Sequence, residues 1–429
     1  MHTPDERDSP LNGRPREKDS PPEAFGSASI RVLPCAYPPG RRTGFPLGLL
    51  LALTGMFFLN FVGRVIFAPL MPAVVADLGI AHAQAGSLFF FVSAGYCAGL
   101  LGSGLVSSHW DHRRTVAASA ACAGVALLGV SLAQDLLSIR AGLLFLGTAA
   151  GLYLPSGLAT LTSLVHPSAR GRAVAVHELA PNLGFVTAPL LAEAFLFRFP
   201  WRVAPGFLGT VCLFAAVAYL WKGRGGEFRG EIPSPRTLRL LAADPAFWLL
   251  MALFTLGIGA SLGVYAVLPL YLVAERGMER EWVNAMVAVS RISGLVAAFG
   301  AGWAADRFGP RRALQGAFFA TGILTILLGV LTDAWVAAAV LLQPLAAVCF
   351  FPPAFAALSR LGPPEVRNVA VSLTVPVAFL LGGGAVPAAI AWLGDAGSFA
   401  RGVILFGLLV LGGSLLCRLL RLPRDDRET

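Results

Sequence analysis

Twelve apolar segments, each long enough to cross a lipid bilayer, constrain this chain more than any other feature. A membrane-spanning helix needs about 20 predominantly apolar residues, and a bilayer offers no water to unpaired backbone groups, so such segments must be helical. They lie at approximately 45–71, 84–107, 115–134, 139–164, 172–197, 203–221, 246–272, 282–305, 313–332, 335–359, 367–393 and 400–420. The sequence therefore predicts an all-α membrane protein with twelve transmembrane helices.

The charged residues support this prediction by their number and by their placement. They make up 13% of the chain, whereas soluble domains contain about 25%. They also gather between the apolar segments. The formal charge of +9 comes from loop arginines in this pattern, so it indicates no nucleic-acid partner. The six cysteines are scattered without a C-x-x-C pair, which predicts neither a metal site nor a disulfide framework.

Polar stretches divide the chain into five parts. Residues 1–44 are rich in Pro, Gly and Ser and predict a disordered tail with no removable signal peptide. A six-helix bundle at 45–221 follows, then a linker loop at 222–245, a second six-helix bundle at 246–420 and a short tail at 421–429.

Arginine and lysine are unequally distributed between the two sets of loops, and this bias predicts the orientation. Basic loop residues mark the cytoplasmic side. Loops on the side of the amino terminus contain fourteen such residues, namely Arg113, Arg114, Arg170, Arg172, Lys222, Arg224, Arg229, Arg236, Arg239, Arg307, Arg311, Arg312, Arg360 and Arg367. The opposite loops contain six, namely Arg140, Arg198, Arg202, Arg276, Arg280 and Arg401. We expect a multi-pass protein of the cell (inner or plasma) membrane with both termini in the cytoplasm.

The two halves of the chain are related in sequence. Residues 154–176 align with 351–373 at a constant offset of 197, which superposes Pro155 on Pro352 and Arg170 on Arg367. This repeat indicates duplication of a six-helix unit, and two such units form bundles related by a pseudo-twofold axis. Parallel repeats of this kind place a substrate site at the membrane midplane between the halves.

A charged loop motif also occurs twice. The second copy, G-x-x-x-D-R-x-G-x-R-R, consists of Gly302, Asp306, Arg307, Gly309, Arg311 and Arg312. The first copy lies 198 residues earlier and retains Gly104, Arg113 and Arg114, but Ser108 replaces the acid and Asp111 replaces the turn glycine. The motif resembles the loop signature of the major facilitator superfamily, a family of twelve-helix secondary transporters. The resemblance implies a fold of two six-helix bundles and transport by alternating access.

In this fold Asp306 lies near the start of helix 5, where a carboxylate stabilises a helix N-terminus by about 0.3–1 kcal/mol. Arg170 and Arg172 would add to the attraction. We predict a latch that joins the halves on the cytoplasmic side when the transporter faces out. The alternative is an acid that only caps its own turn. The corresponding latch in the first half, from Ser108 to helix 11, should be weaker unless Asp111 replaces the missing acid.

Two arginines lie deep inside predicted spans, away from their ends, where a charge costs ~2.5–3.5 kcal/mol at the bilayer centre. Arg64, in the first helix, resembles the arginine of anion-type facilitators, and Arg291 lies ten residues into helix 8. A guanidinium binds a carboxylate through two parallel hydrogen bonds, so these residues favour an anionic substrate. The alternative is neutralisation within one half, for example of Arg64 by Glu178, or extension of the side chain to the membrane surface.

His177 and Glu178 in helix 5 are candidates for proton coupling, because a buried carboxylate or an imidazole can carry a proton near neutral pH. A structural pair that anchors helix 5 to helix 1 is the alternative. Four polar residues of helices 1, 4, 7 and 10 could bind substrate or instead stabilise helix contacts; they are Asn60, Tyr153, Tyr265 and Gln343.

The leading functional prediction is a monomeric secondary transporter of a small organic anion, with proton-coupled symport or exchange and no cofactor. A polyspecific drug/proton antiporter is the alternative, although the family's helix 4 arginine is out of register and its helix 5 motif survives only loosely, from Gly184 to Glu193. A transport-inactive sensor is a third possibility. The chain has no nucleotide-binding loop and no nucleophile–base signature, so we expect no enzymatic activity.

Overall fold

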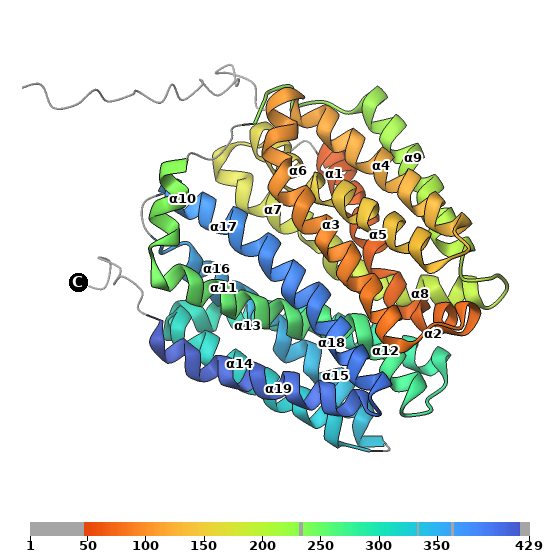
Figure 1. Ribbon diagram of the computed structural model, residues 1–429. Coiled ribbons are helices and arrows are strands. Elements are labelled where there is room, and N and C mark those ends of the chain that lie inside the picture. The colour runs from red at the N-terminus through yellow and green to blue at the C-terminus, as the bar shows by residue number, and fades with distance from the viewer. Residues whose placement is uncertain (1–46, 231–234, 333, 362–363, 421–429) are drawn as a thin grey trace, which may run out of the picture. The chain divides into compact units, whose positions relative to one another are not determined.

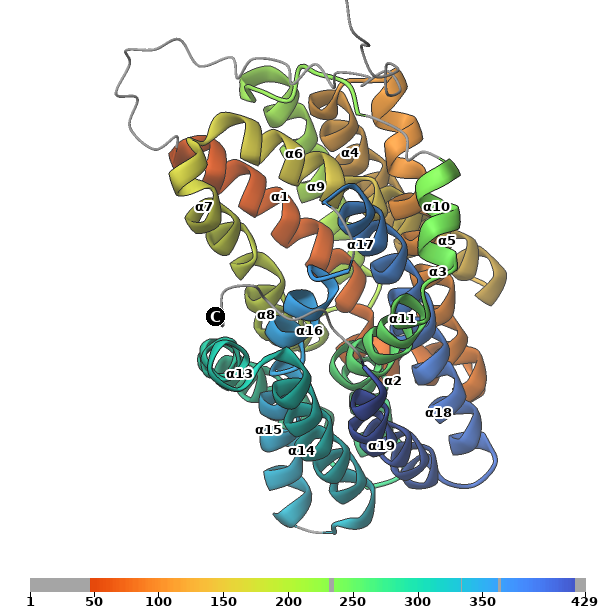
Figure 2. The same cartoon turned by 90° about the vertical axis from the view of Figure 1, so that its left-hand side faces the viewer.

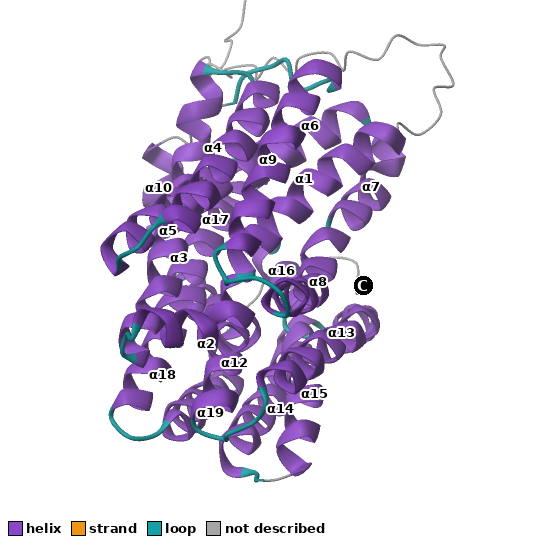
Figure 3. Cartoon of the chain, turned by 90° about the vertical axis from the view of Figure 1, so that its right-hand side faces the viewer, coloured by secondary structure: helices purple, strands orange, loops and turns teal. Residues whose placement is uncertain are grey.

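The computed structural model describes residues 47–230, 235–332, 334–361 and 364–420, which belong to one unit of the chain, Thr43–Thr429. In these ranges the regular elements are helices (Figure 3). Twelve helical segments are long and apolar enough to cross a membrane, which confirms the predicted all-α fold with twelve spans. The predicted tails and part of the linker lie outside the described residues, and the domain limits stay predictions.

The amino-terminal half contains the first six spans (Figure 1). The first span runs to Leu78, beyond its predicted end at residue 71, because the chain remains helical through Pro72. The helices of this half are α1 (Leu47–Val65), α2 (Phe67–Leu78), α3 (His82–His109), α4 (His112–Leu132), α5 (Leu136–Gly151), α6 (Tyr153–Leu164), α7 (Arg170–His177), α8 (Leu179–Leu196) and α9 (Val203–Lys222).

The carboxy-terminal half repeats this arrangement after a short helix, α10 (Pro235–Ala242). Its seventh and eleventh spans each contain a π-helical segment, η2 (Gly259–Gly263) and η3 (Phe379–Ala385). The other helices are α11 (Pro245–Ile258), α12 (Val264–Ala274), α13 (Arg280–Phe308), α14 (Pro310–Val330), α15 (Ala334–Val348), α16 (Phe351–Leu358), α17 (Pro364–Ala378), α18 (Val386–Asp395) and α19 (Phe399–Leu416).

Prolines explain why several spans are split into two helices. Proline has no backbone N–H, so the carbonyl four residues earlier loses its helical partner. Pro69 follows the break between α1 and α2, Pro155 follows that between α5 and α6, and Pro352 follows that between α15 and α16. These breaks lie in the first, fourth and tenth spans. The break in the first span places Arg64 in the last turn of α1.

Because the spans alternate in direction, both ends of the described chain lie on one side of the membrane, which we call the terminus side. The opposite side is the far side. The two bundles touch mainly through far-side segments, since α2 packs against α12, α3 against α18 and α8 against α13. Figure 2 shows α1, α6 and α7 together and α13, α14 and α15 together, away from them. The described state is therefore closed towards the far side.

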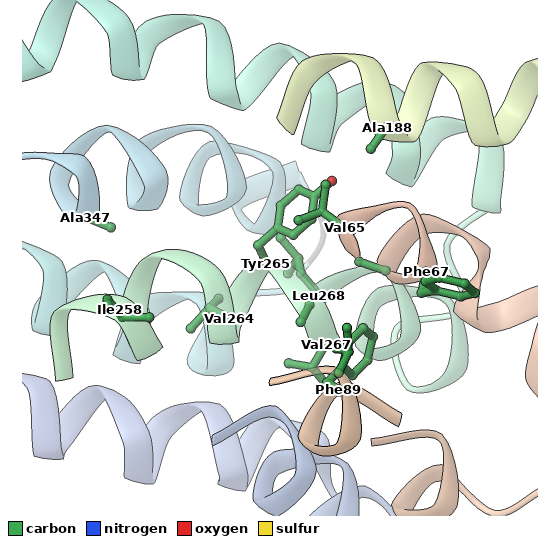
Figure 4. Close-up of a cluster of buried hydrophobic side chains, with 14 of the residues drawn as sticks. Val65, Phe67, Phe89, Ala188, Ile258, Val264, Tyr265, Val267, Leu268 and Ala347 are labelled. Carbon is green, nitrogen blue, oxygen red and sulfur yellow. The ribbon is translucent and has the colours of Figure 1, made fainter. Parts of the chain in front are cut away.

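Apolar side chains fill this far-side contact. Tyr265 and Leu268 of α12 extend towards Val65 of the first span, and Val267 lies beside Phe89 of α3 (Figure 4). All five side chains are buried. Burial of large apolar side chains excludes water from the contact, so the bundles are sealed together at this level.

Equivalent contacts hold the sixth span of each bundle at its far-side end. Asp77, at the end of the first span, accepts hydrogen bonds from Trp201 at 3.0 Å and from Arg202. Glu275 lies 198 residues later, at the end of the seventh span. It accepts hydrogen bonds from the backbone N–H groups of Phe399 and Ala400. Each carboxylate therefore stabilises the beginning of the last helix of its own bundle.

A second pair of contacts holds the other end of the sixth and twelfth spans. Arg113 Nη2 donates to the Leu220 carbonyl at 2.8 Å. Arg311, again 198 residues later, donates to the carbonyl of Cys417 at 3.1 Å and to that of Arg418 at 2.6 Å. Cations at a helix C-terminus satisfy carbonyls that have no partner within the helix. The two halves thus repeat the same construction, as their sequence repeat predicts.

Candidate substrate site

Arg64 is buried among aromatic rings in the last turn of α1. Only 7% of the residue is exposed. Its Cζ atom lies 3.9 Å from the centre of the Tyr96 ring and 5.3 Å from that of the Phe61 ring. The Nε atom has no hydrogen-bond partner. Within the described part of the chain Arg64 forms no ion pair, so the structure does not show the predicted alternative of neutralisation by Glu178.

Arg291 of α13 has a closely similar environment. It is 5% exposed, and its Cζ atom lies 4.4 Å from the centre of the Phe185 ring and 4.7 Å from that of Tyr265. Its Nη2 atom donates to the Ser261 carbonyl at 2.9 Å. Nε and Nη1 have no partner, nor does the buried Tyr265 hydroxyl. No carboxylate among the described residues pairs with Arg291.

The π-helical segment η2 supplies the carbonyl that binds Arg291. A π-turn changes the i→i+4 hydrogen-bond pattern, so local carbonyls can accept bonds from side chains. The Ala260 carbonyl accepts from Gln343 Nε2 at 2.9 Å, and the Ser261 carbonyl accepts from Arg291. Segments of this kind often occur at functional sites. Here η2 fixes the position of the arginine relative to the seventh span.

Two phenylalanines connect the environments of the two arginines. The rings of Phe61 and Phe185 are in edge contact with centres 4.8 Å apart, and Phe185 meets Tyr265 of the other bundle at the same separation. Tyr96 also contacts the other bundle, through the Phe379 ring at 5.0 Å. We call these five rings, together with Arg64 and Arg291, the arginine–aromatic cluster. It lies where the two bundles meet.

The positive charges of the two buried arginines are only partly compensated within the cluster. A cation over an aromatic face gains about 2 kcal/mol when it is desolvated, which offsets part of the cost of burial. Each buried donor without a partner costs a further ~1–3 kcal/mol. The rings cover the faces of the guanidinium groups, but Arg64 Nε and Arg291 Nε and Nη1 stay without a partner. A ligand with negatively charged oxygens would satisfy these donors.

The other three predicted substrate ligands form bonds inside a single bundle. Asn60 Nδ2 donates to the Ala150 carbonyl at 3.0 Å, between the first and fourth spans. Gln343 forms the corresponding bond between the tenth and seventh spans. The Tyr153 hydroxyl donates to the Leu53 carbonyl at 2.6 Å. These contacts favour the structural alternative, and substrate binding by Asn60, Tyr153 and Gln343 stays a prediction.

The two candidates for proton coupling differ in exposure. The His177 ring is fully buried, stacks on Phe57 with ring centres 4.5 Å apart and has its Nε2 atom 3.0 Å from the Tyr153 hydroxyl. The Glu178 side chain is 49% exposed, and its Oε1 atom lies 3.5 Å from His177 Nδ1 without hydrogen-bond alignment. A carboxylate with access to water suits proton exchange better than the enclosed imidazole.

The acid of the second-half loop motif is unbound in this state, although Arg311 of the same motif binds the end of the twelfth span. Asp306 is exposed at the end of α13, and among the described residues it has no hydrogen bond or ion pair. Gly309 has a φ of +82° between α13 and α14, a conformation that favours glycine. A Cβ atom at Gly302 would lie 4.0 Å from the Pro352 side chain, an ordinary van der Waals contact. Arg307 lies near the Trp303 and Phe308 rings, and Arg312 is exposed. The predicted latch to helix 5 is absent here, as expected of a state closed on the far side.

The first-half motif is bound to the linker instead. Asp111 caps its own helix, because it accepts the Arg114 N–H at 2.6 Å. Residues 223–230, which we call the strap, lie across this loop. The Gly226 carbonyl accepts from the Arg113 backbone at 3.1 Å, and the Gly230 N–H donates to the Ser107 carbonyl at 2.9 Å. Gly104 lies one turn before Ser107, whose bond to Gly230 marks the edge of the strap.

Sequence analysis named Tyr265 as a candidate but missed the other four rings of the cluster. Phe61 could have been found, because it lies three residues before Arg64 and therefore on the same helix face. Phe185 and Tyr96 carry no such signal, since their contacts depend on how separate helices pack. In the described ranges, no group of three or more His, Cys, Asp or Glu side chains is placed to hold a metal ion.

A family model described as Major Facilitator Superfamily matches residues 53–387. The chain belongs to the Major Facilitator Superfamily. Its sequence is 25% identical to Multidrug resistance protein MdtL of Escherichia fergusonii over 260 residues, which span 59% of this chain and 66% of that relative, slightly under two thirds of its length.

Solved structures show the same fold. One is a bacterial homolog to the human lysosomal transporter Spinster in an inward-facing, occupied conformation, with a TM-score of 0.74 and 15% identity over 89% of this chain and 97% of that one. Another is a POT family transporter in complex with a thioalcohol-conjugated peptide, with a TM-score of 0.73 and 15% identity over 88% and 96%. This member of the superfamily is therefore a multi-pass membrane transporter and not an enzyme, as its sequence predicts.

Proposed function

We propose that this transporter moves a small organic anion by alternating access. The observation that carries the proposal is the arginine–aromatic cluster, in which two buried guanidinium groups, one from each bundle, have unpaired donors and no carboxylate partner among the described residues. An anion is the ligand that compensates such a site.

The geometry suggests how the anion would couple the two bundles. Aromatic rings occupy the faces of both guanidinium groups, so the ligand would approach their edges, where Arg64 Nε and Arg291 Nε and Nη1 are free. Carboxylate oxygens can accept a charge-assisted hydrogen bond from each of these free donors. A ligand held by both arginines binds best when the bundles are close at this level. It therefore lowers the free energy of the occluded state relative to the open ones.

We further propose that the terminus side is cytoplasmic in the cell membrane, as the arginine bias indicates. The described state then faces inwards and is closed to the outside. Glu178 is our candidate for the proton-binding group, because its side chain is half exposed and lies beside the buried His177. Proton symport and exchange for a second anion are both compatible with this position. We expect the protein to act as a monomer.

A drug/proton antiporter is the second candidate. The likeness to Multidrug resistance protein MdtL supports it, and so do the aromatic rings of the cluster, since a cationic drug can stack on them. Two fixed cations at the same place oppose it, because a cationic ligand would be repelled. The two candidates therefore differ in the charge of the solute that moves.

Uptake into proteoliposomes tests the proposal. The panel contains monocarboxylates, dicarboxylates, inorganic anions and lipophilic cations, each with and without a pH gradient. We expect uptake of an organic anion, reduced about 100-fold in Arg64→Gln and Arg291→Gln, because each loses a charge-assisted bond pair worth about 3 kcal/mol.

Arg140→Gln is the matched control. Arg140 also lies over a ring, that of Phe91, but its donors are satisfied by the Ser87 hydroxyl within one bundle. This variant should transport at close to the wild-type rate. Movement of lipophilic cations alone, unaffected by Arg64→Gln and Arg291→Gln, would replace the anion proposal with the antiporter.

A further inference from the structure

One contact between the bundles at the far side is centred on Glu193 of α8. Arg280, the first residue of α13, donates to this carboxylate through Nε at 2.9 Å and through Nη2 at 3.3 Å. Asn284, one turn later and fully buried, donates to Glu193 at 2.6 Å. We call this group the α8–α13 latch. Its cation is always charged, because arginine does not lose its proton in proteins.

A second contact is centred on Asp395, the last residue of α18. His82, the first residue of α3, lies with its Nδ1 atom 3.1 Å from Asp395 Oδ1. The backbone N–H groups of His82 and Ala83 also donate to this carboxylate, at 2.9 and 2.7 Å. The carboxylate of one bundle thus occupies the N-terminus of a helix of the other, which is a favourable position for an anion. We call this group the α3–α18 latch.

The two latches occupy equivalent positions in the repeat. His82 and Arg280 are 198 residues apart, the same offset as the loop motif. Each begins the second span of its bundle, and each binds an acid at the far-side end of the fifth span of the opposite bundle. The pseudo-twofold axis therefore relates a fixed cation to a titratable one.

The groups around His82 leave Asp395 as its direct charged partner among the described residues. From α19, the Phe399 ring lies 5.0 Å from the imidazole. A further acid on this side, Glu275 at the end of α12, accepts hydrogen bonds from the backbone of Phe399 and Ala400. Arg140 of α5 also contacts α3, but it binds Ser87, which lies more than one helical turn after His82.

We propose that the α3–α18 latch makes the closure of the far side depend on pH through His82, whereas the α8–α13 latch closes it independently of pH. Imidazole gains a proton between about pH 8 and pH 5. The proton adds an ion pair to the two backbone bonds of Asp395, which are present at either pH. Acid therefore favours the far-side-closed state. An exposed ion pair of this kind should change the closed-to-open ratio about two- to fivefold.

The distance between the far-side ends of the bundles reports this equilibrium without any substrate. Spin labels are placed at residues 137 and 335, which are exposed at the far-side ends of α5 and α15, in a background with the native cysteines replaced by serine. Pulsed electron resonance then gives the populations of short and long distances at pH 8 and pH 5.5 in the purified full-length protein.

We expect the short-distance population to rise on acidification in the parent protein, and His82→Gln and His82→Asn to remove this dependence. Glu193→Gln is the matched variant. It should shift the ratio towards the open state at both pH values and retain the dependence on His82, and it supplies a measurable open population if the parent is fully closed. An unchanged pH response in His82→Gln within the Glu193→Gln background would refute the proposal, whatever the outcome of the uptake experiments.

Discussion

The second and fourth spans of the amino-terminal bundle pack through glycine, whereas the equivalent contact in the carboxy-terminal bundle involves larger residues. A Cβ atom at Gly95 would lie 2.0 Å from the Leu144 carbonyl oxygen, and one at Gly99 would lie 2.2 Å from that of Thr148. The residues 198 positions later are Ser293 and Ala297. At this pair of spans, close packing through these two glycines is therefore specific to the amino-terminal bundle, whereas the carboxy-terminal bundle has its close glycine contacts elsewhere, for example between Gly382 and the Thr255 carbonyl.

The two copies of the loop motif also differ in how tightly they are held. In the amino-terminal bundle the strap and the Asp111 cap hold the loop in place, while in the carboxy-terminal bundle Asp306 is exposed without a partner among the described residues. By contrast, Arg113 and Arg311 bind the ends of the sixth and twelfth spans alike. We therefore expect the contacts that both bundles share to stabilise each bundle, and the unpaired Asp306 to serve the proposed movement between them.

The glycine contact should give the largest difference between the bundles. Gly99→Leu inserts a side chain where two backbones touch, so we expect a loss of at least about 3 kcal/mol of stability and little folded protein. Gly102→Leu, on the same helix with open space around it, is the control and should melt like the parent in a detergent thermal-shift measurement. Equal melting of the two variants would show that the close contact is not maintained.

Substitution of one loop acid should reduce transport, whereas substitution of the other should reduce stability. Asp306→Asn removes the charge of the proposed latch, so we expect transport to fall about two- to fivefold with unchanged melting, since the latched state loses about 0.3–1 kcal/mol of stabilisation. Asp111→Ala removes a helix cap and should cost about 1 kcal/mol of stability. Its transport per folded molecule should stay within about twofold of the parent. Uptake in Asp306→Asn at the parental rate would rule out the latch.

The two capping arginines should give the smallest difference, because their contacts are equivalent. Arg113→Ala and Arg311→Ala each leave helix-end carbonyls without a donor, and each should cost about 1–2 kcal/mol. Thermal melting of the two variants side by side tests the equivalence. A much larger effect of Arg113→Ala would mean that its bond to Glu227 at 3.2 Å and the strap contribute more than the helix cap does.

Much of the fold could be predicted because its causes are local. Apolar length determines where the chain can cross a bilayer, and proline determines where a span is interrupted, as Pro69 and Pro155 show. Less of the candidate site could be predicted. Arg64 and Arg291 are recognisable as charges inside apolar segments, but Phe185, Asn284 and Asp395 are ordinary residues until a second helix is placed beside them.

The sequence alone determined the twelve spans, the duplicated unit, the superfamily and the two intramembrane arginines, because hydropathy, repeat offset and motif spacing do not depend on distant contacts. Only the tertiary structure decided that both arginines join one aromatic cluster between the bundles. It also decided that Asn60, Tyr153 and Gln343 bind within a bundle. The physical reason is that a helix face is known from the sequence, whereas the partner of that face is chosen by packing among all twelve helices.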